Sequence, residues 1–103
     1  MLSYVYVISA AEEGPVKIGF SKTPEKRLKK LQTGHPEELR LYYFHSLPEK
    51  NVKLMERAVH DLNRHKRIKG EWFNMSVNDA ILEIKHAVIK YSESVELITQ
   101  KVY

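Results

Sequence analysis

Apolar, β-branched residues and turn-forming residues follow one another in the first part of the chain in an order that predicts two strands. Residues 4–8 are β-branched and aromatic, which is typical of a strand. Residues 12–15 read Glu-Glu-Gly-Pro and predict a turn, after which residues 16–20 predict a second strand.

The second strand has two different faces. Val16, Ile18 and Phe20 share one face because side chains alternate along a strand, and we expect that face to point into the core. Lys17 then lies on an open face, since lysine is almost never buried without a partner. Gly19 lies on the same face, and a glycine inside a strand often marks close approach by a ligand or another backbone.

A short helix is predicted over residues 24–32. Thr23 offers a hydroxyl N-cap, Pro24 suits the first helical position, and Gly34 ends the helix. Residues 39–45 predict a third strand. The apolar residues on one face of this strand are Leu39, Leu41 and Tyr43. The pattern as a whole predicts an α+β fold with a three-stranded antiparallel sheet flanked by helices.

A second helix is predicted from about residue 49 or 51 to residue 65. Its expected buried stripe consists of Val52, Met55, Val59 and Leu62. Glu56 and His60 lie four residues apart, so both side chains can reach the same space. Residues 70–73, Gly-Glu-Trp-Phe, interrupt the helical pattern, and we interpret the two aromatic residues as a packing anchor.

A third helix is predicted from residue 76 onward, because Ser76 and Asp79 resemble a capping box. Its apolar residues are spaced as a heptad seam: Val77, Ile81, Ile84, Val88, Tyr91, Val95, Ile98 and Val102. We therefore divide the chain into a core, residues 1–75, and a C-terminal helical extension, residues 76–103, that packs on the core and can form a homodimer. The alternative is a break at residues 92–94 followed by a short docking segment.

Composition favours an intracellular protein, and the distribution of charge favours a negatively charged partner. The 103 residues include no cysteine, which excludes disulfides and thiolate zinc sites, and no apolar run approaches the length of a membrane span. We expect a soluble cytoplasmic protein. The net charge is +4, and basic residues are concentrated in residues 22–31 and 53–69. A phosphate backbone is the natural partner of such segments if they share one surface, although solvated helix faces would look the same.

Several short motifs together resemble those of the GIY-YIG nuclease superfamily. The matching residues are Tyr4-Val5-Tyr6, Lys17-Ile18-Gly19, Arg27, Leu31-Gln32-Thr33-Gly34, Glu56 with His60, and Gly70-Glu71-Trp72-Phe73. They are most similar to small phage-type and stand-alone domains whose second motif reads Lys-Ile-Gly. The chain departs from the superfamily name at Tyr4, where glycine is usual, and at Lys17, where the second tyrosine is usual.

The resemblance implies a Mg²⁺-dependent (or Mn²⁺-dependent) DNA endonuclease or nickase. It makes Glu56 the metal ligand, Arg27 the group that binds a phosphate oxygen, and Tyr6 the base that takes a proton from water. Because a tyrosine with its ordinary pKa is a poor base at neutral pH, we expect the Lys17 ammonium to lower the pKa of Tyr6. His60 is a second candidate for the base or a phosphate donor.

Two other functions fit the same sequence. In the first, the chain is a nucleic-acid-binding module that has lost cleavage. In the second, it is a protein-interaction factor that assembles through its C-terminal helix. In the absence of the resemblance, Tyr6 reads as a core tyrosine, and Arg27 and Glu56 as charges on helix surfaces.

Overall fold

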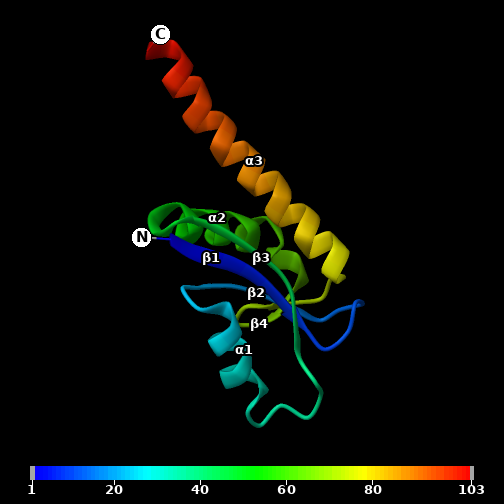
Figure 1. The fold of residues 1–103 in the computed structure, drawn as a ribbon. Coiled ribbons are helices and arrows are strands. Elements are labelled where there is room, and N and C mark those ends of the chain that lie inside the picture. The colour runs from blue at the N-terminus through cyan, green and yellow to red at the C-terminus, as the bar shows by residue number, and fades with distance from the viewer. Residues whose placement is uncertain (1, 103) are drawn as a thin grey trace.

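The computed structural model describes the backbone of residues 2–102 and the side chains of residues 2–90. In chain order its elements are β1 (Leu2–Ser9), β2 (Val16–Ser21), α1 (Pro24–Gln32), β3 (Arg40–Pro48), α2 (Glu49–Leu62), a 3₁₀ turn (Arg64–Lys66), β4 (Arg67–Lys69), β5 (Trp72–Phe73) and α3 (Val77–Val102). The strands form one antiparallel sheet with the order β3-β1-β2-β5-β4. Helices α2 and α3 lie on one face of the sheet and α1 on the other (Figure 1).

The α+β class is confirmed, but the prediction of a three-stranded sheet was wrong. Two short strands, β4 and β5, extend the sheet to five strands. β5 pairs with β2, and β4 pairs with β5. They contain three and two residues, respectively. Segments this short carry no measurable alternation, so the hydrophobic pattern could not reveal them.

Two apolar clusters lie on opposite faces of the sheet. The larger one, against α2 and α3, contains Val5, Val7, Val16, Ile18, Val52, Met55, Val59, Phe73, Met75, Val77, Ala80 and Ile84. The smaller one, against α1, contains Tyr6, Ile8 and Leu39 with half-buried Leu28, Leu31, Leu41 and Trp72 around it. The smaller cluster leaves Tyr6 buried directly beside the first turns of α1.

The strand predictions need two corrections. Phe20 is 36 % exposed rather than buried, because it lies near the end of β2, where the Lys53 ammonium lies 5.8 Å from its ring. In β3 the pairing with β1 shifts between Val7 and Ile8, so Tyr42 is an extra residue. The apolar residues 39 and 41 therefore pack on the α1 side, whereas Tyr43 packs on the other side.

Helix α1 has the predicted bounds, and Gly34 follows it with a φ of +79°, as a helix-ending glycine often does. The predicted cap is absent: Thr23 makes no side-chain capping hydrogen bond, and its own N–H instead donates to Ser21 Oγ. Pro24 at the helix start is confirmed.

Helix α2 ends at Leu62, three residues before the predicted end. Val52, Met55 and Val59 are fully buried as predicted, but Leu62 is 69 % exposed. Asn63 is buried in its place and its amide donates to the Val59 carbonyl at 2.9 Å, which helps to end the helix. Periodicity alone does not distinguish Asn63, whose side chain hydrogen-bonds a carbonyl of the last helical turn, from an ordinary polar surface residue.

Helix α3 begins as predicted, since Ser76 Oγ accepts a hydrogen bond from the Asp79 N–H at 3.0 Å. The first half of the apolar seam packs on the domain itself, with Val77 and Ile84 buried and Ile81 and Val88 half-buried. The rest of the seam, Tyr91, Val95, Ile98 and Val102, lies outside the described side chains. Among the residues that the structure describes, no helix has the length and apolarity that a bilayer crossing needs.

Candidate active site

Gly19 on β2 is the point at which the candidate site is assembled. It pairs with Tyr6 across the β1–β2 ladder, so the two residues share a sheet face. A Cβ atom at Gly19 would lie 2.5 Å from the Tyr6 hydroxyl and 2.9 Å from Glu71 Oε1. The close approach that the sequence predicted therefore comes from the protein's own phenol and carboxylate, and only glycine leaves room for both.

Lys17 was expected on an open face, and this was wrong: it is only 7 % exposed. Its ammonium lies 3.1 Å from Glu71 Oε1 and 5.7 Å from the centre of the Trp72 ring. The lysine is buried because β5 pairs beside β2, so that Trp72 covers it and Glu71, the residue before β5, supplies a carboxylate.

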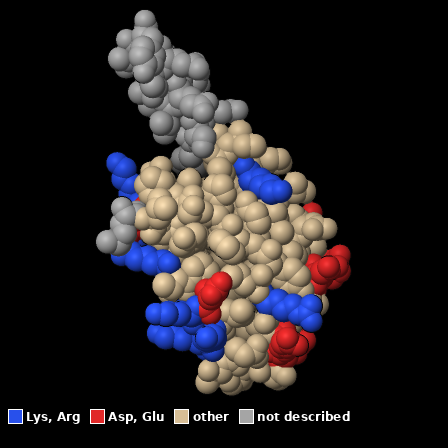
Figure 2. Space-filling view, in the orientation of Figure 1, with Lys and Arg blue, Asp and Glu red and all other residues tan. Residues whose placement is uncertain are grey.

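A pocket of about 460 Å³ opens beside Tyr6. It is lined by Tyr6, Phe20, Ser21, Thr23, Lys26, Arg27, Lys30 and Glu71. Three of these residues are cations from α1, which begins directly after β2. In Figure 2, Lys and Arg side chains lie mainly on the left of the visible face, the lowest of them in the region of α1, and most acidic residues lie on the right. The pocket is therefore suited to an anion, and we refer to it as the basic pocket.

The two basic segments contribute unequally to this pocket. Its cations come from residues 22–31, and none of its described lining residues belongs to residues 53–69. Lys53 of α2 comes near the pocket without lining it, since its ammonium lies 5.8 Å from the ring of the lining residue Phe20.

Glu56 on α2 is a half-buried carboxylate with an unsatisfied oxygen. Its Oε2 atom is buried and has no hydrogen-bond partner among the described residues. Burial, and secondarily the nearby charge of Glu71, raise the pKa of Glu56 from 4.5 to about 7, while Lys17 acts in the opposite direction. Glu56 is therefore close enough to both members of the Lys17–Glu71 pair to interact with them.

The pKa of Tyr6 is raised above its ordinary value, contrary to the expectation that Lys17 would lower it. Burial is the largest cause, and the charges of Glu71 and Glu56 add to it. The cation that opposes the rise is Arg27, through a side-chain hydrogen bond and its charge. Since Lys17 pairs with Glu71, Arg27 is the cation that acts on the phenol.

His60 contacts the backbone of β2. Its Nε2 lies 2.8 Å from the Ile18 carbonyl oxygen, and since a carbonyl only accepts, Nε2 is the donor. The Ile18 N–H in turn donates to the Glu71 carbonyl at 3.1 Å, and the His60 ring packs on Phe73 at 4.9 Å. His60 and Glu71 therefore fix the part of β2 that precedes Gly19.

Glu71 is a site residue that the sequence pattern does not predict. Trp72 and Phe73 dominate residues 70–73, and the pattern predicts only a packing anchor there. Phe73 is indeed fully buried and Trp72 half-buried, which confirms the anchor. The sequence pattern gave no signal for this role, because it placed Lys17 on an open face, where a lysine needs no acidic partner.

The raised pKa of Glu56 predicts a pH-dependent stability in metal-free buffer. Between about pH 4.5 and 7 the folded carboxyl keeps a proton that the unfolded chain releases, so the free energy of unfolding falls as pH rises through this window. Glu56→Gln removes this loss. We expect the variant to exceed the wild type by about 1 kcal/mol above pH 7, after allowance for solvent screening, and to match it below pH 4.5.

Urea unfolding at several pH values measures this difference. Asp61→Gln on the same helix is the matched control, because Asp61 is exposed. A stability gap between Glu56→Gln and the wild type that is the same at pH 4 and pH 8 would contradict the prediction.

The fold and site together define a small α+β domain in which Tyr6, Arg27 and Glu71 line a basic pocket and the carboxylate of Glu56 acts on Tyr6. The chain belongs to the T5orf172 domain family, whose model matches residues 3–89 and which is a phage-derived family related to GIY-YIG-like nucleases. No curated protein and no solved structure matches the chain.

Proposed function

We propose that this domain is a Mg²⁺-dependent DNA endonuclease or nickase of the GIY-YIG type that hydrolyses phosphodiester bonds. The observation that carries the proposal is that Arg27 on α1, Glu56 on α2 and Glu71 just before β5 all act on Tyr6, whose hydroxyl lies against Gly19 of β2. Membership of a family related to GIY-YIG-like nucleases supports it.

Glu56 suits a magnesium ion, with Mn²⁺ as a substitute. A buried carboxylate oxygen without a hydrogen-bond partner is a site for a hard cation, and Mg²⁺ is commonly held by one or two carboxylates and several waters. Among the described residues, no group of three or more acidic or histidine side chains forms a larger cage. When bound, the ion supplies Lewis-acid stabilisation of charge on the phosphate.

Arg27 and Tyr6 form the phosphate side of the site. The Arg27 guanidinium lines the pocket and offers several donors in a plane, which suits the non-bridging oxygens of a phosphate. Tyr6 takes a proton from the attacking water, and Arg27 favours its phenolate form. Neutralising the charge of Glu56 removes one of the contributions that raise the pKa of Tyr6, which links cation binding to this proton transfer.

Lys17, Glu71 and His60 act mainly by positioning. Lys17 holds the Glu71 carboxylate at 3.1 Å and opposes the rise in the pKa of Glu56, so it favours the ionised form that binds a cation. His60 holds β2 through the Ile18 carbonyl, which leaves it less suited to act as the base. We therefore assign proton abstraction to Tyr6.

The experiment that tests the proposal is nicking of supercoiled plasmid with Mg²⁺ or Mn²⁺. The wild type should convert the plasmid to open circles in a metal-dependent way, Glu56→Ala should not, and Asp61→Ala on the same helix should behave as wild type. Absence of nicking by the wild type with both metals at pH 7 to 9 would overturn the proposal, and nicking by Glu56→Ala would indicate a contaminant.

One observation favours a second candidate, a DNA-binding module that does not cleave. A buried tyrosine whose pKa is raised is an unfavourable base at neutral pH. In this case the wild type and Glu56→Ala would bind DNA equally and neither would nick it. Binding that weakens steeply with salt would still identify the basic pocket as the contact, because neutralised phosphates release counterions.

Assembly through α3 into a homodimer is a separate proposal. Leu82 and Ile89 are each about half exposed and lie seven residues apart, so they form an apolar stripe on the helix surface. Light scattering of the wild type and of a Leu82→Glu/Ile89→Glu variant tests it. A monomeric wild type would overturn the proposal.

A further inference from the structure

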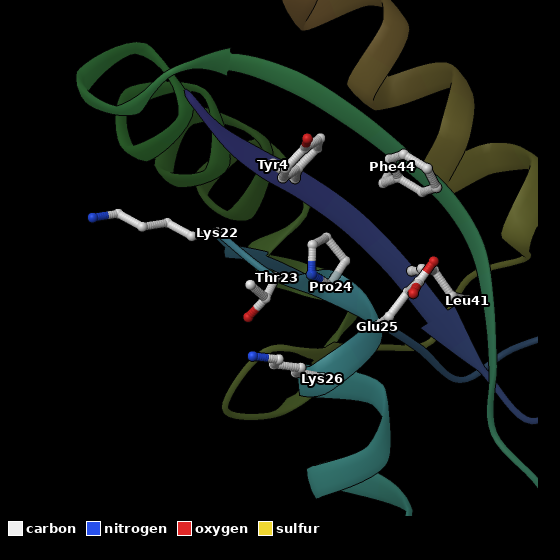
Figure 3. A pocket seen from close by; sticks show the side chains of 8 residues that line it. All are labelled: Tyr4, Lys22, Thr23, Pro24, Glu25, Lys26, Leu41 and Phe44. Carbon is white, nitrogen blue, oxygen red and sulfur yellow. The ribbon is translucent and has the colours of Figure 1, made fainter. Parts of the chain in front are cut away.

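A second pocket lies next to the basic pocket and differs from it in character. Its volume is about 370 Å³, within the range of small-molecule sites. It is lined by Tyr4, Lys22, Thr23, Pro24, Glu25, Lys26, Leu41 and Phe44, as Figure 3 shows. Thr23 and Lys26 line both pockets, so the two are adjacent. We refer to this second pocket as the aromatic pocket.

Two aromatic rings form its apolar wall. Tyr4 and Phe44 meet edge to face with their centres 5.7 Å apart. Phe44 is paired with Tyr6 across the β1–β3 ladder, so it lies on the same sheet face as the candidate active site. Phe44 is nevertheless 52 % exposed, which leaves part of its ring accessible to a flat ligand.

Two lysines border the same pocket. The amino groups of Lys22 and Lys26 extend toward the same side of it in Figure 3. Lys22 also lies 3.7 Å from Glu49, but both side chains are about half exposed, and such a pair is weak in water. Lys22 can therefore turn to a phosphate group.

Glu25 restricts what the pocket accepts. Its carboxylate lies among the lining residues and disfavours a second anion inside the pocket. A carboxylate also accepts hydrogen bonds from exocyclic amino groups, such as those of a nucleobase. The pocket thus combines an aromatic surface, a hydrogen-bond acceptor and cations at one side.

We propose that the aromatic pocket binds an unpaired nucleobase next to the phosphate held in the basic pocket. The base stacks on Phe44 and Tyr4, and its phosphate contacts Lys22 and Lys26. Aromatic rings that alternate with cations are the usual means of binding single-stranded nucleic acid, because every base has a face that can stack. A paired base inside a duplex cannot reach such a pocket, so the substrate has an unpaired nucleotide beside the bond that is cut.

This inference rests on the proposed nuclease function, but it can be tested without cleavage. Fluorescence anisotropy in EDTA compares one dye-labelled DNA oligonucleotide as a single strand and as a duplex, together with an RNA of the same sequence. We expect the wild type to bind the single strand more tightly than the duplex. Phe44→Ala should weaken single-strand binding about tenfold and leave duplex binding unchanged.

Two control variants separate stacking from folding effects. Phe44→Trp keeps a ring and should retain single-strand binding, whereas Ile68→Ala removes a side chain of similar exposure on β4 and should change nothing. A fluorescent adenine analogue in the oligonucleotide should change its emission on binding to the wild type and Phe44→Trp but not to Phe44→Ala. Comparison of the DNA and RNA arms shows which sugar the pocket accepts.

The outcomes distinguish this inference from the proposed function. If Phe44→Ala binds single strands as tightly as the wild type, or if the wild type prefers duplex DNA, the aromatic pocket does not bind a base. If the single-strand preference depends on Phe44 but no plasmid is nicked, the base site holds and the nuclease proposal fails.

Discussion

Replacing Arg27 with alanine is expected to slow metal-dependent nicking of supercoiled plasmid by about 10²- to 10³-fold. Arg27 lines the basic pocket and is the cation that opposes the raised pKa of Tyr6. Its removal takes away the forked donor for a phosphate oxygen. It also removes both contributions that favour the Tyr6 phenolate, so the ascending limb of the pH–rate profile, where the base loses its proton, should move to higher pH.

The matched control for this change is Lys29→Ala. Lys29 lies on the same helix and carries the same charge, but it is exposed and does not line the basic pocket. Arg27→Lys should recover part of the rate, because lysine restores the charge without the planar donor geometry. An Arg27→Ala protein that nicks as fast as Lys29→Ala, with the same pH profile, would show that Arg27 is only a surface charge.

Adding a single methyl group at Gly19 is expected to damage both stability and activity. The new Cβ would lie 2.5 Å from the Tyr6 hydroxyl, 2.7 Å from the ring carbon that bears it, and 2.9 Å from Glu71 Oε1. The buried ring cannot move aside freely, so we expect Gly19→Ala to lower the free energy of unfolding by about 1–3 kcal/mol. Displacing the hydroxyl should also cost about 10²-fold in nicking rate.

A double-variant cycle attributes this stability loss to the contact with Tyr6. Urea unfolding is measured for the wild type, Gly19→Ala, Tyr6→Leu and the double variant. Because leucine has no atoms where the tyrosine hydroxyl lies, Gly19→Ala should cost less in the Tyr6→Leu background. Equal costs in both backgrounds would place the strain elsewhere, with the carboxylate of Glu71 as the remaining neighbour.

Local patterns were sufficient to predict several elements of the fold. The bounds of α1 follow from Pro24 and Gly34, because proline and glycine act through their own backbone preferences. The buried stripe of α2 follows from its period, and three of its four predicted residues are fully buried. The fourth, Leu62, is exposed because the helix ends there. Helix ends depend on hydrogen bonds from side chains to the last carbonyl groups, which periodicity does not reveal.

The candidate site was predictable in part. Arg27 and Glu56 both interact with Tyr6. The resemblance to the GIY-YIG motifs implied that these three residues lie close together. The electrostatics were not predictable, because the sequence places Lys17 two residues from Gly19 and gives no sign of its partner. Glu71 is the residue before β5, a strand of only two residues. The pairing of β5 with β2 decided which carboxylate Lys17 would meet.

The amino-acid sequence by itself determined the class of fold, the first two strands, the first helix, and Arg27 and Glu56 as residues that act on Tyr6. The tertiary structure alone decided which charges are neighbours, and therefore that Arg27 rather than Lys17 acts on the phenol and that Glu56 has a pKa of about 7. The physical reason is range: backbone preferences and alternation act between near neighbours in the chain, whereas burial and charge act between groups that only sheet pairing and helix packing bring together.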